Sequence, residues 1–431
     1  MIRTLDARAG IDAVVAALGR SPETVPPEIH RTVDAILAAV RARGDAAVCE
    51  HTARLDGWNP ARPGDLALSP ADFESGERAV APDVRAALEY AAERIERYHA
   101  AAMPKSWRMT DEHGSVLGQE VRALDRVGVY VPGGRAAYPS TVLMTVVPAR
   151  VAGVKEIVLV TPAGAGGRID NVVLAAARIA GVTEGYRIGG AQAVAALAYG
   201  TSLIRRVDKI VGPGNIYVAL AKARVFGEVG IDMVAGPSEV VVVADATADP
   251  DWIASDMLAQ AEHDPMARAL LVTDANELIP RVEHALGRQL ESLPRRAIAE
   301  QALQANGALI RVANLDDAMT LANLLAPEHL ELLVAAPTAL LPRVKHAGAV
   351  FLGGHTPEVV GDYVAGPNHV LPTAGTARSQ GGLSVYTFLR VRTWLRIDDP
   401  AAARPLMEDA AWFGRTEGLE AHARSAERRL D

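Results

Sequence analysis

The hydrophobic positions divide the 431-residue chain into stretches with two different periods. Residues 29–44 and 83–101 place apolar side chains at i, i+3 and i+4, which is the spacing of a helix that buries one face. From about residue 129 onward, short apolar runs such as 156–161 alternate with helical patterns such as 171–181. Short buried strands that are each followed by a helix predict parallel sheets covered on both faces.

Two such alternating series follow one another, and the second begins near residue 239. The pattern predicts an α/β fold with two doubly wound Rossmann-like domains, together with small N- and C-terminal appendages. The expected division of the chain is a main domain of residues 26–128 and 239–385, an inserted domain of residues 129–238, an N-terminal arm of residues 1–25 and a C-terminal helical tail of residues 386–431.

The glycine-rich turns do not follow the common dinucleotide-binding motif. That motif is GxGxxG after the first strand, and the sequence TPAGAGGRID has the glycines at the wrong spacing. Any nucleotide would therefore be held by other turns at the carboxyl ends of strands, such as VYVPGGRAAYPS, IGGAQA and VGPGNIY. Each of these turns could also be an ordinary connection between a strand and a helix.

Composition and charge limit the possible partners. The net charge is −8 and the pI is near 5.8, which argues against nucleic acid or an anionic membrane as a partner. The N-terminal stretch MIRTLDARAGIDAVVAALGR lacks the pattern of a signal peptide, and no apolar run reaches the length of a membrane span. We therefore expect a cytoplasmic protein.

Cys49 is the only cysteine, which excludes an intrachain disulfide and a cluster of thiolate metal ligands. It lies in a stretch with a helical pattern, where a small, buried, apolar role is the usual one. No neighbouring residue resembles a partner base, so we expect no covalent catalysis by a thiol.

Several histidines, an aspartate and a glutamine have the side chains of a metal site with nitrogen and oxygen ligands. Gln260 and His263 are three positions apart on a predicted helix and so share a face. Asp362 and His369 belong to a loop rich in glycine and proline, and His422 lies on the last predicted helix. Imidazole and carboxylate ligands suit a divalent transition metal such as zinc. An ordinary surface histidine is the alternative for His263.

Glu328 and His329 interrupt the apolar stretch LLAPEHLELLV. Pro327 disfavours helix at Ala326, so the preceding helix must end there and the pair lies at an irregular junction before the next strand. Only at such a junction can two adjacent side chains reach one pocket. A buried carboxyl beside an imidazole suits general acid/base catalysis, and a solvated surface pair is the alternative.

Eight motifs resemble those of the histidinol dehydrogenase family, in the same order and over nearly the whole chain. They are VYVPGGRAAYPSTVLM, GGAQAVAALAYGT, DKIVGPGN, AGPSE, LAQAEHD, APEHLE, GDYVAGPNHVLPT and EGLEAH. The resemblance implies oxidation of L-histidinol through L-histidinaldehyde to L-histidine, with two NAD and one water, in the last steps of histidine biosynthesis. It also implies one zinc ion per subunit and a domain-swapped homodimer in which the C-terminal tail completes the partner's active site.

The resemblance also implies a role for each matching residue. The zinc ligands would be Gln260, His263, Asp362 and His422. The acid/base residues would be Glu328 and His329. The side chains in contact with histidinol would be Ser238, Gln260, His263, His329, Asp362, His369, Glu417 and His422. The side chains in contact with NAD, in the inserted domain, would be Tyr130, Gln192 and Asn215.

The chemistry of these residues agrees with the implied reaction. His329 can take the hydroxyl proton, and Glu328 can activate the water that hydrates the aldehyde. Two alternatives stay open: an NAD-dependent dehydrogenase of the same fold that acts on another small polar alcohol, and a nucleotide-binding regulatory protein without catalysis.

Overall fold

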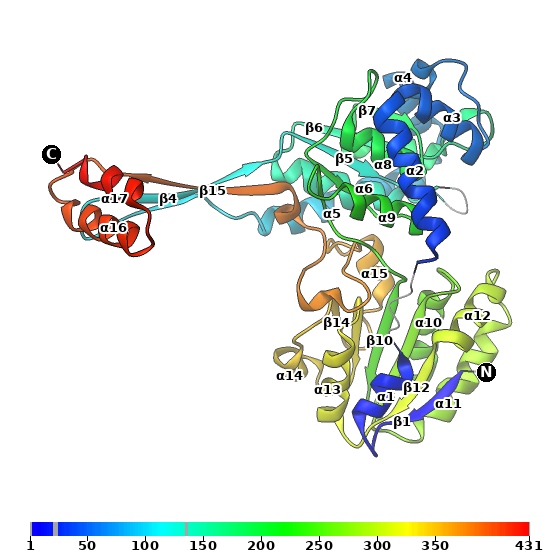
Figure 1. The fold of residues 1–431 in the computed structure, drawn as a ribbon. Helices are drawn as coiled ribbons and strands as arrows, with labels where there is room; N and C mark the ends of the chain where they lie inside the picture. The colour runs from blue at the N-terminus through cyan, green and yellow to red at the C-terminus, as the bar shows by residue number, and fades with distance from the viewer. Residues whose placement is uncertain (1, 20–24, 134–136, 431) are drawn as a thin grey trace.

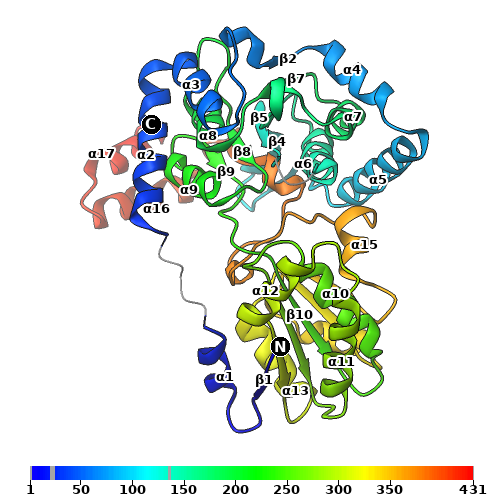
Figure 2. The same cartoon turned by 90° about the vertical axis from the view of Figure 1, so that its right-hand side faces the viewer.

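The computed structural model describes residues 2–19, 25–133 and 137–430. Figures 1 and 2 show two α/β units, one above the other, and Figure 1 also shows a long arm that leaves the upper unit. Two six-stranded sheets form the centres of these units, and a three-stranded antiparallel sheet forms the arm. The predicted α/β fold with parallel sheets is confirmed.

The upper unit is built on a sheet with the strand order β2-β7-β6-β5-β8-β9. Its strands are β2 (Ala67–Leu68), β5 (Arg126–Tyr130), β6 (Glu156–Thr161), β7 (Glu184–Arg187), β8 (Lys209–Val211) and β9 (Gly230–Ile231). All neighbouring strands are parallel except β2 and β7. The connecting helices are α6 (Pro139–Ala152), α7 (Asn171–Ala180), α8 (Gly190–Tyr199) and α9 (Ile216–Val225).

The N-terminal helices also belong to the upper unit, so the predicted grouping of residues 26–128 with residues 239–385 is wrong. These helices are α2 (Pro27–Arg43), α3 (Asp45–Leu55), α4 (Pro70–Ala79) and α5 (Pro82–Ala101), and they pack on α6, α7, α8 and α9. Val33 and Ile36, for example, join a core cluster with Val194 of α8. Helical periodicity reveals that a face is buried but not which element covers it.

The lower unit is built on an entirely parallel sheet with the strand order β1-β12-β11-β10-β13-β14. Its strands are β1 (Arg3–Asp6), β10 (Glu239–Ala244), β11 (Arg268–Thr273), β12 (Ala308–Arg311), β13 (His329–Leu333) and β14 (Ala349–Leu352). Its helices are α1 (Ile11–Leu18), α10 (Pro250–Ala261), α11 (Leu278–Leu290), α12 (Arg296–Asn306), α13 (Leu315–Leu325), α14 (Pro337–Leu340) and α15 (Glu358–Tyr363).

The N-terminal segment is part of this lower unit and not a separate arm as predicted. β1 pairs in parallel with β12 and forms one edge of the sheet, while α1 packs on α13. The pairing joins Arg3 to Ala308. A four-residue strand whose hydrogen-bonding partner lies so far along the chain leaves no local sequence signal.

The arm carries the C-terminal tail away from both units. Its sheet contains β3 (Trp107–Thr110), β4 (Val116–Ala123) and β15 (Leu389–Arg396), and its tip holds α16 (Arg404–Thr416) and α17 (Glu420–Glu427). Figure 1 shows the two tip helices at the end of the β4–β15 ribbon. The predicted helical tail of residues 386–431 therefore contains, ahead of its helices, a strand that is paired to β4.

Five short 3₁₀ turns complete the described chain: Pro63–Leu66, Ala165–Gly167, Leu341–Arg343, Thr376–Arg378 and Val385–Phe388. Among the described helices, none has both the length and the apolar character to span a bilayer.

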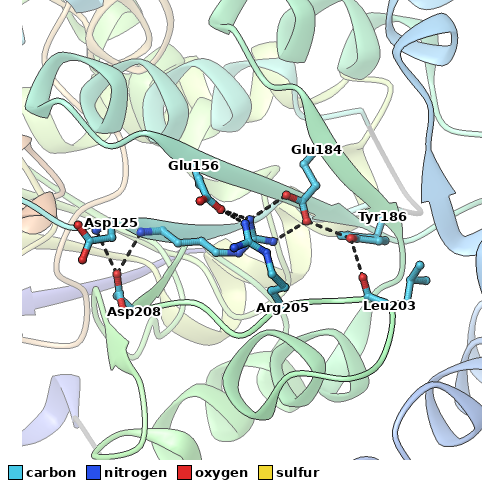
Figure 3. Close-up of polar contacts among 8 residues, drawn as sticks. Asp125, Glu156, Glu184, Tyr186, Leu203, Arg205 and Asp208 are labelled. Atoms are coloured by element: carbon cyan, nitrogen blue, oxygen red, sulfur yellow. Dashed lines mark hydrogen bonds and ion pairs between the residues drawn. The ribbon is translucent and has the colours of Figure 1, made fainter.

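Ion pairs join the amino ends of three strands in the upper sheet. The buried Arg126 guanidinium at the start of β5 donates hydrogen bonds of 2.6 Å to Glu156 and 2.8 Å to Glu184, which lie at the starts of β6 and β7. Figure 3 shows the two carboxylates converging there, with Tyr186 and Arg205 beside them. Charge pairing therefore stabilises the end of the sheet where these three strands begin.

Candidate active site

Glu328 and His329 lie at the junction between α13 and β13, as predicted. Ala326 takes the left-handed conformation with φ of 45° and ends α13, and β13 begins at His329. The exposed fractions of Glu328 and His329 are only 5% and 4%, so the alternative of a solvated surface pair is wrong. A carboxyl and an imidazole are thus buried side by side.

The Glu328 carboxyl has the character of a base that works near neutral pH. Burial raises its pKa to about 7, while the charge of His329 opposes this rise. The Glu328 Oε2 atom also accepts a hydrogen bond of 3.1 Å from the backbone N–H of Glu239 at the start of β10. A general base is most effective when its pKa lies close to the working pH.

The His329 ring is surrounded by carboxyl groups. Its Nδ1 lies 3.4 Å from Glu358 Oε1 and 3.9 Å from Glu328 Oε2, and its Nε2 lies 3.5 Å from Asp362 Oδ1. Burial alone would lower the pKa of the imidazole, but the three carboxylates outweigh it and raise the pKa to about 10. The surrounding carboxyl groups therefore stabilise the protonated ring.

The short helix α15 supplies two of these carboxyls. Glu358 is its first residue and Asp362 lies one turn further, so both side chains share the helix face that meets His329. Glu331, on the same face of β13 as His329, accepts a 3.0 Å hydrogen bond from the backbone N–H of Glu358. Burial raises the pKa of Glu331 well above its usual value and that of Glu358 to about 8.

Sequence reasoning missed Glu358 and Glu331. The available signals were the four-residue spacing of Glu358 and Asp362, with Pro357 marking a helix start, and the two-residue spacing of His329 and Glu331 along a strand. These spacings show shared faces only after the helix and the strand are assigned.

Three of the four predicted metal ligands belong to the lower unit. Gln260 is buried near the end of α10, and its Oε1 accepts no hydrogen bond from any described residue. His263 follows α10 and lies close enough to Asp362 for each charge to shift the pKa of the other group. His263 is exposed in the single chain, so the alternative of an ordinary surface histidine stays open. A buried amide oxygen without a partner among the described residues suits a cation ligand.

The carboxylates beside His329 form a second possible arrangement of ligands. Ligand atoms of His329, Glu358 and Asp362 lie within 4.8 Å of one another. Asp362 is common to both arrangements. The fourth predicted ligand, His422, is exposed on α17 at the tip of the arm, as is Glu417 at the end of α16, so neither belongs to the pocket of its own chain.

Ser238 and His369, both predicted to contact substrate, flank the pocket. Ser238 is half-buried immediately before β10. The His369 Nδ1 lies 2.9 Å from the backbone oxygen of Asp362, and its Nε2 lies 3.5 Å from Thr141 Oγ1 at the start of α6. His369 therefore joins the pocket of the lower unit to a helix of the upper unit.

The three predicted NAD contacts gather at the carboxyl ends of strands in the upper sheet. Tyr130 ends β5, and its hydroxyl oxygen accepts a 3.0 Å hydrogen bond from the N–H of Gly190 at the start of α8. Gln192 on α8 is buried, and its amide atoms have no hydrogen-bond partner among the described residues. Asn215 is exposed and caps the N-terminus of α9. Helix N-termini at such an edge suit the phosphates of a nucleotide.

The first of the three glycine-rich turns, VYVPGGRAAYPS, lies partly outside the described residues, because these exclude 134–136.

The candidate residues of the two units lie at opposite ends of the strands. The candidate cofactor residues follow the carboxyl ends of β5, β7 and β8, whereas Glu328, His329 and Ser238 lie at the amino ends of β13 and β10. The rule that sites lie at carboxyl ends therefore applies to the upper sheet alone. The Thr141–His369 contact brings the two edges together.

Comparison with known proteins agrees with this geometry. The model of the family described as histidinol dehydrogenase matches residues 20–430. The histidinol dehydrogenase of Chromobacterium violaceum is 53% identical over 405 residues, which are 94% of this chain and 93% of that protein. That of Cereibacter sphaeroides is 53% identical over 424 residues, which are 98% of this chain and 97% of that protein.

A solved structure extends the match to the whole fold. The crystal structure of histidinol dehydrogenase from Elizabethkingia anophelis superposes with a TM-score of 0.95 at 32% identity, and the match covers 100% of this chain and 98% of that one. Sequence and structure agree over nearly the full length, and the chain therefore belongs to the histidinol dehydrogenase family, which makes it an oxidoreductase.

Proposed function

We propose that the protein catalyses the zinc-dependent, NAD-linked oxidation of L-histidinol through L-histidinaldehyde to L-histidine. The observation that carries this proposal is the buried Glu328–His329 pair, which lies beside Asp362, whose backbone oxygen contacts His369, the residue that reaches Thr141 of the upper unit. This arrangement offers two bases, a candidate cation site and a candidate nucleotide site around one pocket.

In the first oxidation, His329 takes the hydroxyl proton of histidinol while a hydride passes from the carbinol carbon to NAD. The products are the aldehyde, NADH and one proton. The carboxyl groups of Glu358, Glu328 and Asp362, within 3.4 to 3.9 Å of the ring nitrogens, stabilise the imidazolium that forms. Those carboxylates therefore favour the charged state that follows proton transfer.

In the second oxidation, Glu328 takes a proton from water as the water adds to the aldehyde carbon. The hydrate then loses a hydride to a second NAD and its remaining hydroxyl proton to His329, which gives the carboxylate of histidine. The pKa of Glu328, about 7, leaves a substantial ionised fraction at neutral pH. Cys49 lies in a separate core cluster, so hydration takes the place of a covalent thiol adduct.

Zinc would be held by Gln260, His263, Asp362 and the His422 of a second subunit, where its charge would bind and orient the substrate. The unpaired oxygen of Gln260 and the closeness of His263 to Asp362 support this set. The protein supplies the base and the orientation, because zinc has no redox chemistry of its own.

A homodimer would bring His422 and Glu417 to the site. The arm exposes large apolar side chains, including Trp412 at 61% and Phe413 at 60%. Trp107, Val391 and Leu395 on the ribbon are also exposed. Contiguous exposed apolar surface usually marks a protein interface. We infer that each arm packs against a second copy of the chain and completes its site.

The test of the proposed function is NAD reduction with histidinol, with and without a strong chelator. We expect two NADH per histidinol consumed, loss of activity on chelation, and recovery with added zinc. Full activity in demonstrably metal-free protein would contradict the zinc requirement. A panel of small polar alcohols tests the alternative substrate class, and the absence of any turnover would favour a regulatory protein.

A further inference from the structure

The Glu358 carboxyl is buried against the imidazole of His329, on the side of its Nδ1 atom. Its exposed fraction is 2%, and its Oε1 lies 3.4 Å from Nδ1 of His329. The Nε2 of His329 faces Asp362, a candidate metal ligand, and so points to the side where substrate would bind. Only one ring nitrogen of His329 is therefore available for chemistry, and the other is directed at Glu358.

The surroundings of Glu358 fix its position. Glu331 accepts the backbone N–H of Glu358 at 3.0 Å, and so holds the start of α15 against β13. Gly361 lies so close to β14 that a Cβ atom there would meet the Phe351 ring at 2.6 Å. The helix is thus packed tightly over the strand face that carries His329 and Glu331.

We propose that Glu358 is a positioning residue for His329: its Oε1, 3.4 Å from Nδ1, fixes the orientation and tautomer of the ring and keeps Nε2 turned toward Asp362. A carboxylate on the far nitrogen of a catalytic imidazole favours the tautomer in which the near nitrogen is a base. This inference rests on the proposed function, because it assigns a partner to the base of that reaction.

Two other roles for Glu358 make different predictions. A metal ligand would lose bound zinc on substitution, since Glu358 also belongs to the group of ligand atoms with His329 and Asp362. A purely structural carboxyl would affect folding, and its effect on the rate would be independent of His329. A positioning residue acts only through His329, so its effect should vanish when His329 is absent.

The experiment is a double-mutant cycle with the zinc-loaded full-length enzyme: wild type, E358Q, H329A and the E358Q/H329A double variant. We expect E358Q to lower kcat by about 10- to 100-fold, as is typical for residues that orient a reacting group. The KM for histidinol, the zinc content and the melting temperature should stay close to wild type. The double variant should be as slow as H329A alone, and E358D should recover part of the rate.

The results distinguish the inference from the function on which it rests. If the wild type oxidises histidinol and E358Q does so equally well, the positioning role is wrong and the proposed function stands. The role would also be overturned if the rate losses of E358Q and H329A multiplied in the double variant, or if E358Q lost its zinc. If E358Q does not fold, the same cycle with E358D decides. A wild type without histidinol turnover would overturn the proposed function itself.

Discussion

At the scale of single side chains, Glu328 and His329 are adjacent in the chain, but different causes shift their pKa values. Glu328 is buried with a backbone N–H as its hydrogen-bond partner, and burial raises its pKa to about 7. His329 is equally buried, but carboxylates on both sides of the ring raise its pKa to about 10. Adjacent groups with distinct surroundings can serve two different proton transfers.

The two residues should therefore contribute to different steps. H329A is expected to slow both oxidations, and E328Q is expected to slow aldehyde oxidation more than alcohol oxidation, because an amide cannot take a proton from water. General acid/base residues typically contribute about 10²- to 10⁴-fold. Presteady-state traces with histidinol and with histidinaldehyde measure each step, and equal losses in both steps for E328Q would contradict the division.

Cys49 is expected to be dispensable. It is half-buried against the core cluster of α2 and α8, and burial raises the pKa of its thiol, which makes it a poor nucleophile. C49A should keep near-normal rates and lose about 1 kcal/mol of stability or less, the cost of one small buried group. A thousand-fold loss of rate in a folded variant, about 4 kcal/mol of barrier, would show that the thiol takes part in the reaction.

Among the helices and strands, the turn from β8 to α9 shows how tightly the candidate cofactor edge is built. Gly212 has φ of 110°, its N–H donates to Asp232 at 2.7 Å, and its carbonyl accepts from the buried Lys222 at 2.9 Å. Lys222 and Asp232 also form a buried ion pair. A Cβ atom at Gly212 would lie 2.1 Å from the Tyr130 carbonyl oxygen.

G212A should consequently destabilise the protein more than G227A. Gly227 has a similar φ of 105°, but its Cβ atom would meet no atom within 4 Å, so it isolates the conformational strain, about 1 to 3 kcal/mol. G212A adds the clash and should also weaken NAD binding, because the turn lies beside Tyr130. Urea unfolding and NAD titration compare the two variants, and equal effects would mean that the turn has room to adjust.

For the protein as a whole, the arm would leave the single chain without two of the residues proposed for its site. Glu417 and His422 lie on α16 and α17 at the end of the β4–β15 ribbon, far from Gln260 and Asp362 (Figure 1). In a symmetric dimer each arm would reach the other copy, so every site would combine one body with the partner's tail.

Mixed dimers test this sharing. One chain carries H422A with an intact body, and the other carries H329A with an intact tail. One site of the heterodimer is then wholly intact and the other is doubly defective, so activity should recover to about half of wild type by counting sites in a two-fold assembly. If each chain completed its own site, both sites would keep one defect and the purified heterodimer would be as inactive as its parents.

The amino-acid sequence was sufficient to predict the parallel α/β sheets and the junction before β13. Local signals carry these features: apolar periodicity marks strands and helices, and Pro327 marks the end of α13. Family motifs suggested the residue roles, and of the residues concerned the structure brings Asp362 and His369 close to His329.

Tertiary structure alone decided which elements belong together. The N-terminal helices pack on the upper sheet, and β1 pairs with β12, because hydrophobic faces and strand edges select their partners by shape and not by distance along the chain. The same is true of Glu358 and Glu331, whose carboxyls surround His329 only because α15 folds back over β13. Periodicity reveals that a side chain is buried, and only packing determines what it is buried against.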